Sequence, residues 1–113
     1  MNGLPKDTDL SFLIGRQLEQ VAVGAFQIQL HFDASVCISI EGESELDGAR
    51  APAGVEAGRL VLGLIGQVVS DARPIAERHL GLTFDNGATL TVIESDEPFE
   101  SYNITSPGGT LIV

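Results

Sequence analysis

The hairpin that decides the fold lies at residues 80–92, which read LGLTFDNGATLTV. Apolar side chains recur at every second position on both sides of Asn86-Gly87, which is the pattern of two half-buried strands. Asn-Gly is also a strong signal for a tight hairpin turn. A two-residue loop would place Leu82 opposite polar Thr91, so we expect a three-residue loop with Gly87 at a positive φ angle. The alternating apolar residues are Leu80, Leu82, Phe84, Leu90 and Val92.

A similar hairpin occurs earlier in the chain, where Phe32-Asp33 corresponds to Phe84-Asp85. Leu13-Ile14-Gly15 corresponds in the same way to Leu64-Ile65-Gly66. The order, the spacing and the apolar pattern of these segments agree, so we interpret the chain as two diverged copies of one unit. The residues predicted to face inward in the first hairpin are Phe26, Ile28, Leu30 and Phe32 on one strand and Val36, Ile38 and Ile40 on the return.

Each copy is predicted to begin with a short helical turn. Side-chain oxygens of Thr8-Asp9 can cap the first turn, and residues 55–65 form its counterpart in the second copy. Gly15 and Gly66 follow the two turns and can adopt the left-handed conformation that ends a helix. The next strand, at residues 17–23, has apolar positions that are only partly in phase, which predicts a β-bulge.

The fold is therefore predicted to be mainly β, within a single domain at residues 1–113. Two pseudo-symmetric helix–strand–hairpin repeats would build an antiparallel sandwich or a half-open barrel. The predicted segments are repeat 1 at about residues 9–47, a Gly/Ala/Pro connector at 47–54, repeat 2 at about 55–105, and a docked C-terminal hairpin strand at 110–113.

Charge and composition exclude several classes of partner. Sixteen acidic residues against six basic ones give a net charge of −10. Such a chain repels nucleic acid, whose binding depends on Lys and Arg, and it repels anionic membrane surfaces for the same reason. The lone Cys37, the absence of a signal-like N-terminus and the shortness of every apolar run predict a cytoplasmic protein.

The acidic residues are concentrated after the two hairpins. In the first copy they occupy every second position, so a continuing strand would project them to one side. They have two interpretations: a solvated edge that prevents strand-to-strand aggregation, or a docking face for a basic protein partner. The candidate binding residues are Glu41, Glu43, Glu45 and Asp47 in the first copy and Glu94, Asp96, Glu100 and the adjacent Tyr102 in the second. For Tyr102, a position at the edge of the core is the favoured alternative to a surface contact.

Catalytic and metal motifs are incomplete. His31 and Cys37 are expected on neighbouring strands with Asp33 nearby, and a Cys–His pair can form a thiolate nucleophile. However, neither a third orienting group nor a pair of oxyanion donors can be identified. Two histidines and one cysteine also lack the spacing of zinc ligands. We therefore expect a protein that is not an enzyme and that has no catalytic residue, metal or cofactor.

Several segments resemble a family of small uncharacterised bacterial proteins, a domain of unknown function. The resemblance covers the chain from about Leu10 to Val113, and the sequence departs from the family pattern at Ala34-Ser35, where a glycine turn is usual. It implies no activity and no functional residues. The segments that carry it are Leu13-Ile14-Gly15, residues 27–33, residues 38–43, residues 82–87 and Glu100-Ser101-Tyr102.

Three functional hypotheses follow. The leading one is a non-enzymatic acidic protein-interaction module, similar in class to the immunity proteins that neutralise toxins or nucleases. The alternative is a small-molecule or cation-binding β domain with its ligand between the two copies. The remote alternative is a thiol enzyme that uses Cys37 and His31. A homodimer is compatible with all three.

Overall fold

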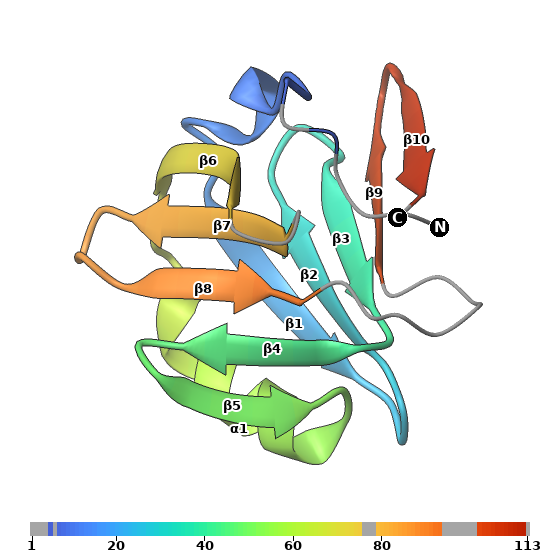
Figure 1. The fold of residues 1–113 in the computed structure, drawn as a ribbon, viewed down its shortest axis with the longest axis vertical. Coiled ribbons are helices and arrows are strands. Elements are labelled where there is room, and N and C mark those ends of the chain that lie inside the picture. The colour runs from blue at the N-terminus through green and yellow to red at the C-terminus, as the bar shows by residue number, and fades with distance from the viewer. Residues whose placement is uncertain (1–4, 6, 76–78, 94–101, 113) are drawn as a thin grey trace.

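The protein forms two antiparallel five-stranded sheets that pack as a sandwich and are not closed into a barrel (Figure 1). The computed structural model describes residues 5, 7–75, 79–93 and 102–112. The first sheet has the order β1 (Leu18–Val23), β2 (Ile28–Phe32), β3 (Cys37–Ile40), β9 (Tyr102–Ser106) and β10 (Gly109–Ile112). The second has the order β5 (Ala49–Pro52), β4 (Glu43–Leu46), β8 (Thr89–Val92), β7 (His79–Phe84) and β6 (Val69–Ile75). The predicted mainly-β sandwich is therefore confirmed.

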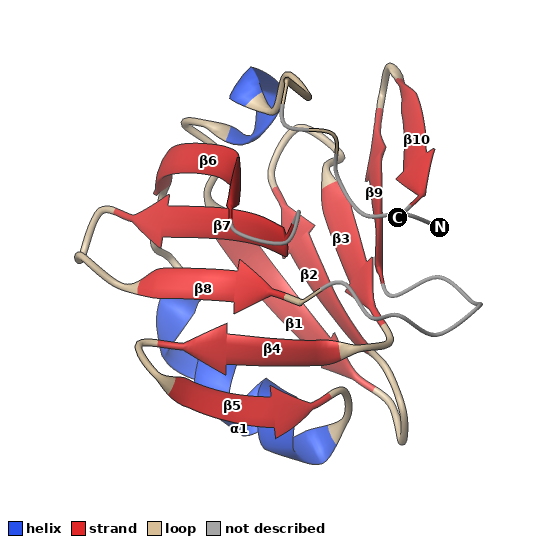
Figure 2. Ribbon diagram, in the orientation of Figure 1, coloured by secondary structure: helices blue, strands red, loops and turns tan. Residues whose placement is uncertain are grey.

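Short helical segments lie at opposite ends of the sandwich (Figure 2). The 3-10 turn η1 (Ser11–Leu13) lies at one end, and the helix α1 (Val55–Val61) lies at the other and continues into the 3-10 turn η2 (Leu62–Leu64). Of the two side chains predicted to cap η1, only that of Asp9 reaches it: its carboxylate accepts a hydrogen bond from the Ser11 amide at 2.9 Å, whereas the Thr8 hydroxyl donates to the Pro5 carbonyl. Leu10 occupies the N-cap position itself and provides no side-chain cap. The helical turns predicted before the two first strands are thus present.

Each half of the chain begins one of the two sheets. The last hairpin of each half, however, pairs with the sheet that the other half begins. The hairpin β4–β5 follows β3 in sequence but pairs with β8, where Ser44 lies opposite Val92. The hairpin β9–β10 follows β8 in sequence but pairs with β3, where Ile38 lies opposite Ile104. The two halves are therefore held together by strand pairing as well as by core packing.

Residues 47–54, predicted to be a connector, instead form a turn and the strand β5. Asp47 and Gly48 have φ angles of 49° and 94°, which are the two positive values of a two-residue hairpin turn. The following residues pair with β4, as in Glu45 opposite Arg50. Small residues and proline suggested a linker, but the Asp-Gly turn directs them back along β4.

The β7–β8 hairpin has the predicted loop. Leu82 pairs with Leu90, and the Phe84 amide donates to the Ala88 carbonyl at 2.9 Å. This leaves a three-residue loop in which Gly87 has a φ of 88°. The bulge predicted in the first strand is also present, since the pairing of β1 with β2 shifts register between Leu18 and Gln20.

The core lies between the two sheets and consists mainly of the alternating aliphatic residues. One predicted member is wrong: Phe26 is 84% exposed. The Gly24 amide donates to the Gln27 carbonyl at 2.8 Å, so Phe26 lies in a tight turn before β2 begins at Ile28. The fully buried residues include Leu30, Ile38, Leu82, Leu90 and Tyr102.

Matching hydrogen bonds join the edge strands of the two sheets. The Gly15 amide donates to the Val69 carbonyl at 2.8 Å, and the Gly66 amide donates to the Leu18 carbonyl at 2.7 Å. Both glycines have positive φ angles, of 87° and 91°, as predicted for the residues that end the helical turns. The contact between the edges β1 and β6 is thus built from corresponding residues of the two halves.

Ser44 is a polar residue in the core, and its removal is expected to stabilise the protein. Its side chain is fully buried, and its Oγ has no hydrogen-bond partner within the described residues. Ser44→Ala removes this desolvated hydroxyl, so the free energy of unfolding in urea should rise by about 1 kcal/mol. Ser70→Ala is the control, because the exposed Ser70 hydroxyl donates to the Thr83 carbonyl. A loss of stability in Ser44→Ala would contradict this interpretation.

Candidate binding pocket

The described surface contains an apolar pocket of about 610 Å³ beside the β9–β10 hairpin. Three segments that are distant in sequence form it: η1, the β2–β3 loop and the β9–β10 hairpin. Its volume falls within the range of about 300–1,000 Å³ that is typical of small-molecule sites. The lining residues are Phe12, Arg16, Ala34, Val36, Ile104, Ser106, Pro107, Gly108, Gly109, Thr110 and Leu111.

The walls of the pocket belong partly to the core and partly to the surface. Val36 and Ile104 are buried, so they form a fixed, apolar part of the pocket wall. Phe12 on η1 is 39% exposed, and Leu111 on β10 packs against the edge of the core. A ligand would therefore replace water on aliphatic and aromatic surface, which is the main source of affinity in such sites.

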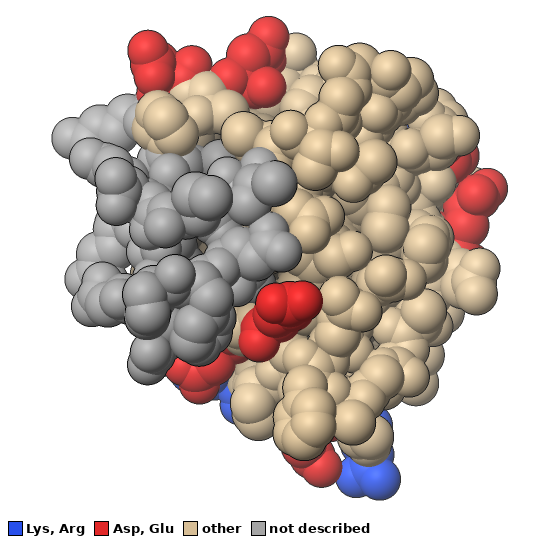
Figure 3. Space-filling view, turned by 90° about the vertical axis from the view of Figure 1, so that its right-hand side faces the viewer, with Lys and Arg blue, Asp and Glu red and all other residues tan. Residues whose placement is uncertain are grey.

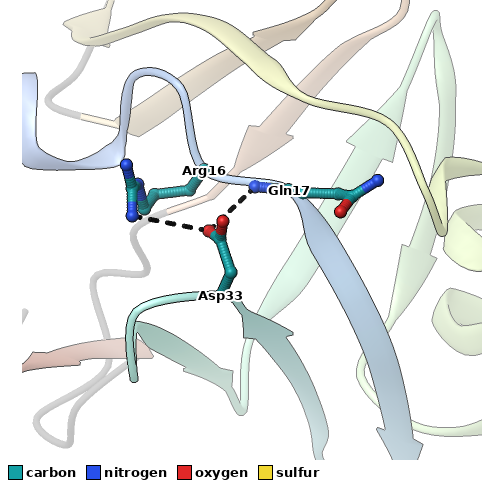
Figure 4. Close-up of polar contacts among 3 residues, drawn as sticks. All are labelled: Arg16, Gln17 and Asp33. Atoms are coloured by element: carbon teal, nitrogen blue, oxygen red, sulfur yellow. Dashed lines mark hydrogen bonds and ion pairs between the residues drawn. The ribbon is translucent and has the colours of Figure 1, made fainter.

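Among the described residues, Arg16 is the only charged one that lines the pocket, and it pairs with Asp33, which in turn is bonded to Gln17 (Figure 4). Its Nη1 lies 3.6 Å from Asp33 Oδ1. The same carboxylate oxygen accepts a hydrogen bond from the Gln17 amide at 3.1 Å, and the Asp33 amide donates to the Gln17 carbonyl at 3.0 Å. The backbone of Gln17, just before β1, therefore positions Asp33, and the carboxylate of Asp33 positions the Arg16 guanidinium at the pocket.

The corresponding residues of the second half have different side chains. By the alignment of Leu13-Ile14-Gly15 with Leu64-Ile65-Gly66, Phe12 corresponds to Gly63 and Arg16 to Gln67. The second half also begins with the longer helix α1, which packs against β5. The pocket residues on the first half are thus those in which the two halves differ. The sequence suggested a ligand between the two copies as an alternative, but it did not identify these lining residues, because no periodic pattern relates η1 to the β9–β10 hairpin.

The predicted acidic row is divided between two sheets. The chain turns after Ile40 at the end of β3 and enters the other sheet at Glu43, so the residues do not form one continuing strand. Glu43 and Glu45 face outward on β4, where Arg50 of β5 lies 3.9 Å and 3.6 Å from their carboxylates. The β4–β5 hairpin thus brings Arg50 alongside this row, where its single positive charge is shared between the two carboxylates.

The other candidate acidic residues have separate environments. Asp47 accepts a hydrogen bond from the Thr89 amide at 2.9 Å, which ties it to the hairpin turn, whereas Glu41 is exposed at the corner between the sheets. Tyr102 is fully buried, so its ring packs in the core and cannot be a surface contact. Three further candidates lie outside the described residues: Glu94, Asp96 and Glu100.

His31 and Cys37 are direct cross-strand neighbours, as expected from the hairpin. Burial raises the pKa of the Cys37 thiol above its ordinary value, and the Ser39 hydrogen bond lowers it by less. A raised pKa leaves less thiolate at neutral pH, so Cys37 does not have the environment of an activated nucleophile. His31 Nε2 lies 3.1 Å from Gln29 Oε1.

The described residues contain neither a cluster of metal-ligating side chains nor a helix that could span a membrane. No group of three or more His, Cys, Asp or Glu side chains is placed to hold a metal ion within residues 5, 7–75, 79–93 and 102–112. In the same part of the chain, no helix is both long enough and apolar enough to cross a lipid bilayer.

The fold and the pocket define a class of protein: a small two-sheet β domain with an apolar cavity between η1 and its last hairpin. The chain belongs to a family described as a family of unknown function (DUF6188), whose sequence profile matches residues 10–113. No curated protein and no solved structure matches it.

Proposed function

We propose that this protein is a non-enzymatic binding domain that holds a small, mainly apolar molecule in the pocket beside the β9–β10 hairpin. The observation that carries the proposal is the pocket itself, whose walls are largely apolar and whose volume is about 610 Å³. The acidic row supports a docking face less well, because Arg50 offsets one of the two negative charges of Glu43 and Glu45, and Asp47 is bonded to the β8 backbone.

The charges around the pocket favour an uncharged ligand. Arg16 is paired with Asp33, so the two groups together add no net charge at the pocket. The net charge of −10 repels anions at longer range, and a cation would meet the guanidinium at the pocket wall. The pair still offers N–H donors and a carboxylate acceptor, so one neutral polar group on the ligand can bind there.

Binding of an uncharged apolar fluorophore tests the proposal. N-phenyl-1-naphthylamine should show a saturable rise in fluorescence when it is titrated into the folded protein, since it moves from water into an apolar site. Phe12→Asp places a carboxylate at the pocket and should weaken this binding about 10-fold or more. The same titration monitored by thermal unfolding should show a higher melting temperature for the bound protein.

Phe26→Asp is the matched control, because Phe26 is the more exposed phenylalanine and does not line the pocket. It should leave the dye affinity unchanged. The proposal fails if the wild-type protein gives no saturable signal, or if Phe26→Asp reduces binding as much as Phe12→Asp does.

We also infer that the two halves descend from one duplicated unit. The inference is supported by the paired hydrogen bonds of Gly15 and Gly66 and by hairpins of equal loop length. Duplication would explain why the two halves share a fold but differ in the residues that line this pocket. Phe12 and Arg16 of the first half help to shape it, and Gly63 and Gln67 stand at the corresponding positions of the second.

A further inference from the structure

The outward face of the first sheet is unusually free of charge for so acidic a protein. Cross-strand pairing places its outward residues in register, as in His31 opposite Cys37 and Ser39 opposite Asn103. All of those described on β2, β3, β9 and β10 are neutral, and so are the paired outward residues of β1. They are Gln20, Ala22, Gln29, His31, Cys37, Ser39, Asn103, Thr105 and Thr110, which we call the neutral face. Glu19, in the β1 bulge, lies at its margin.

The outward face of the second sheet provides the comparison within the same molecule. It carries five charged residues: Glu43, Glu45, Arg50, Asp71 and Arg73. Viewed from the side on which β3, β9 and β10 lie, the described surface is largely uncharged, with carboxylates around it (Figure 3). Depletion of charged residues is one compositional feature of the core of a protein interface.

We propose that the neutral face is the contact surface of a homodimer, in which it packs against the same face of a second copy. Two chains that each carry a net charge of −10 repel one another. Contact through the neutral face keeps the charges of the second sheet behind a sandwich layer about 10 Å thick. The second sheets of the two copies are then about three such spacings apart, roughly 30 Å, which exceeds the Debye length of about 8 Å at physiological salt, so their charges are largely screened from one another.

The chemistry of the neutral face is self-complementary. Gln29 and Asn103 carry amides, and Ser39 and Thr105 carry hydroxyls, so each group both donates and accepts hydrogen bonds. A twofold arrangement presents the same groups to one another, which is what an isologous interface requires. Among the residues that the structure describes, a basic partner would find one carboxylate on this sheet face, that of Glu19 at the margin. Charge complementarity therefore does not select a basic protein here.

The size of the neutral face indicates a weak dimer. Strand spacing of about 4.8 Å and a rise of about 3.3 Å per residue give five short strands a face of roughly 24 by 15 Å. This is below the contact area of about 800 Å² per partner in a standard complex. Dimerisation should therefore depend on protein concentration. The proposal is independent of ligand binding, since only Thr110 belongs to both the neutral face and the pocket lining.

Sedimentation equilibrium from micromolar to millimolar protein tests the proposal. The apparent mass of the wild-type chain should rise from 11.9 kDa toward twice that value. Ser39→Glu should raise the dimer dissociation constant about 100-fold or more, because the twofold axis brings two added carboxylates together. Thr91→Glu is the matched control. Thr91 lies on β8 opposite Glu45, at the corresponding outward position of the other sheet, and this variant should dimerise like the wild type.

A second variant and a second measurement keep the test decisive. Thr105→Glu, at an exposed position of β9, replaces Ser39→Glu if circular dichroism shows that the latter is unfolded. Alkylation of Cys37, which lies on the neutral face, should slow as wild-type concentration rises and should not slow in the Glu variant. The proposal is overturned if the wild type is monomeric throughout, or if the Ser39 or Thr105 variant dimerises as strongly as Thr91→Glu.

Discussion

Residues 1–53 and residues 54–113 are each expected to be unfolded when produced alone, and to recover the β-sheet circular dichroism spectrum when they are mixed. The cut falls between β5 and α1 and breaks no strand. It nevertheless separates both exchanged hairpins from their partners, because β9 pairs with β3 and β4 pairs with β8. The expected effect is the loss of the whole free energy of unfolding, about 5–15 kcal/mol for a domain of this size.

The physical reason is that each fragment would expose an apolar face and an open strand edge. In residues 1–53, Ile38 and Ile40 on β3 would lose Ile104 and Tyr102 as cross-strand neighbours. The hairpin β4–β5 would remain without β8, and an isolated two-stranded hairpin is marginally stable at best in water. The second fragment loses the corresponding contacts of Leu90 with Leu46.

A truncated chain of residues 1–106 is the control, since it lacks only the edge strand β10 and keeps both inter-half pairings. It should remain folded with reduced stability. A cooperative thermal transition of residues 1–53 alone, at low concentration, would show that this half folds without the exchanged hairpins. That result would contradict the prediction.

Local sequence patterns predicted the hairpins because their determinants are local. The position of Gly87 and the pairing of Leu82 with Leu90 follow from period-two alternation and turn chemistry within a dozen residues. The prediction that Phe26 belongs to the core was wrong because apolar alternation does not indicate where a strand begins. The tight turn that ends at Gln27 excludes Phe26 from β2 and leaves it exposed.

The exchange of hairpins and the pocket depend on contacts between distant segments. The sequence of β4 does not indicate whether this strand pairs with β3 or with β8, because the edge of either strand can form the same backbone hydrogen bonds. Tyr102 did carry a readable signal, since Tyr102 and Ile104 alternate with polar residues, which agrees with the interpretation of Tyr102 as an aromatic residue of the core edge rather than a surface contact. The pocket joins Phe12 to Leu111, and no periodic pattern relates two residues so far apart.

Gly54→Ala is expected to destabilise the protein by about 3 kcal/mol or more. Gly54 precedes α1 with φ 130° and ψ −149°, a conformation that is essentially restricted to glycine. A Cβ built at this position would lie 2.6 Å from the carbonyl oxygen of Ala25. That oxygen belongs to the β1–β2 turn, so the backbone of one end of the sandwich would have to move to accept the methyl group.

The same contact explains why the effect should extend beyond one residue. The Gly54 carbonyl accepts the first helical hydrogen bond, from the Gly58 amide at 2.9 Å, so a shift of Gly54 also displaces the start of α1. Gly63→Ala is the matched control, because Gly63 lies in η2 without a positive φ and its added Cβ would meet no atom within 4 Å. Alanine restricts the unfolded chain more than glycine does, so Gly63→Ala should be neutral or slightly stabilising. Urea unfolding of the two variants therefore distinguishes the effect of close packing at Gly54 from a general intolerance of alanine. Equal unfolding midpoints for the two variants would refute the role assigned to Gly54.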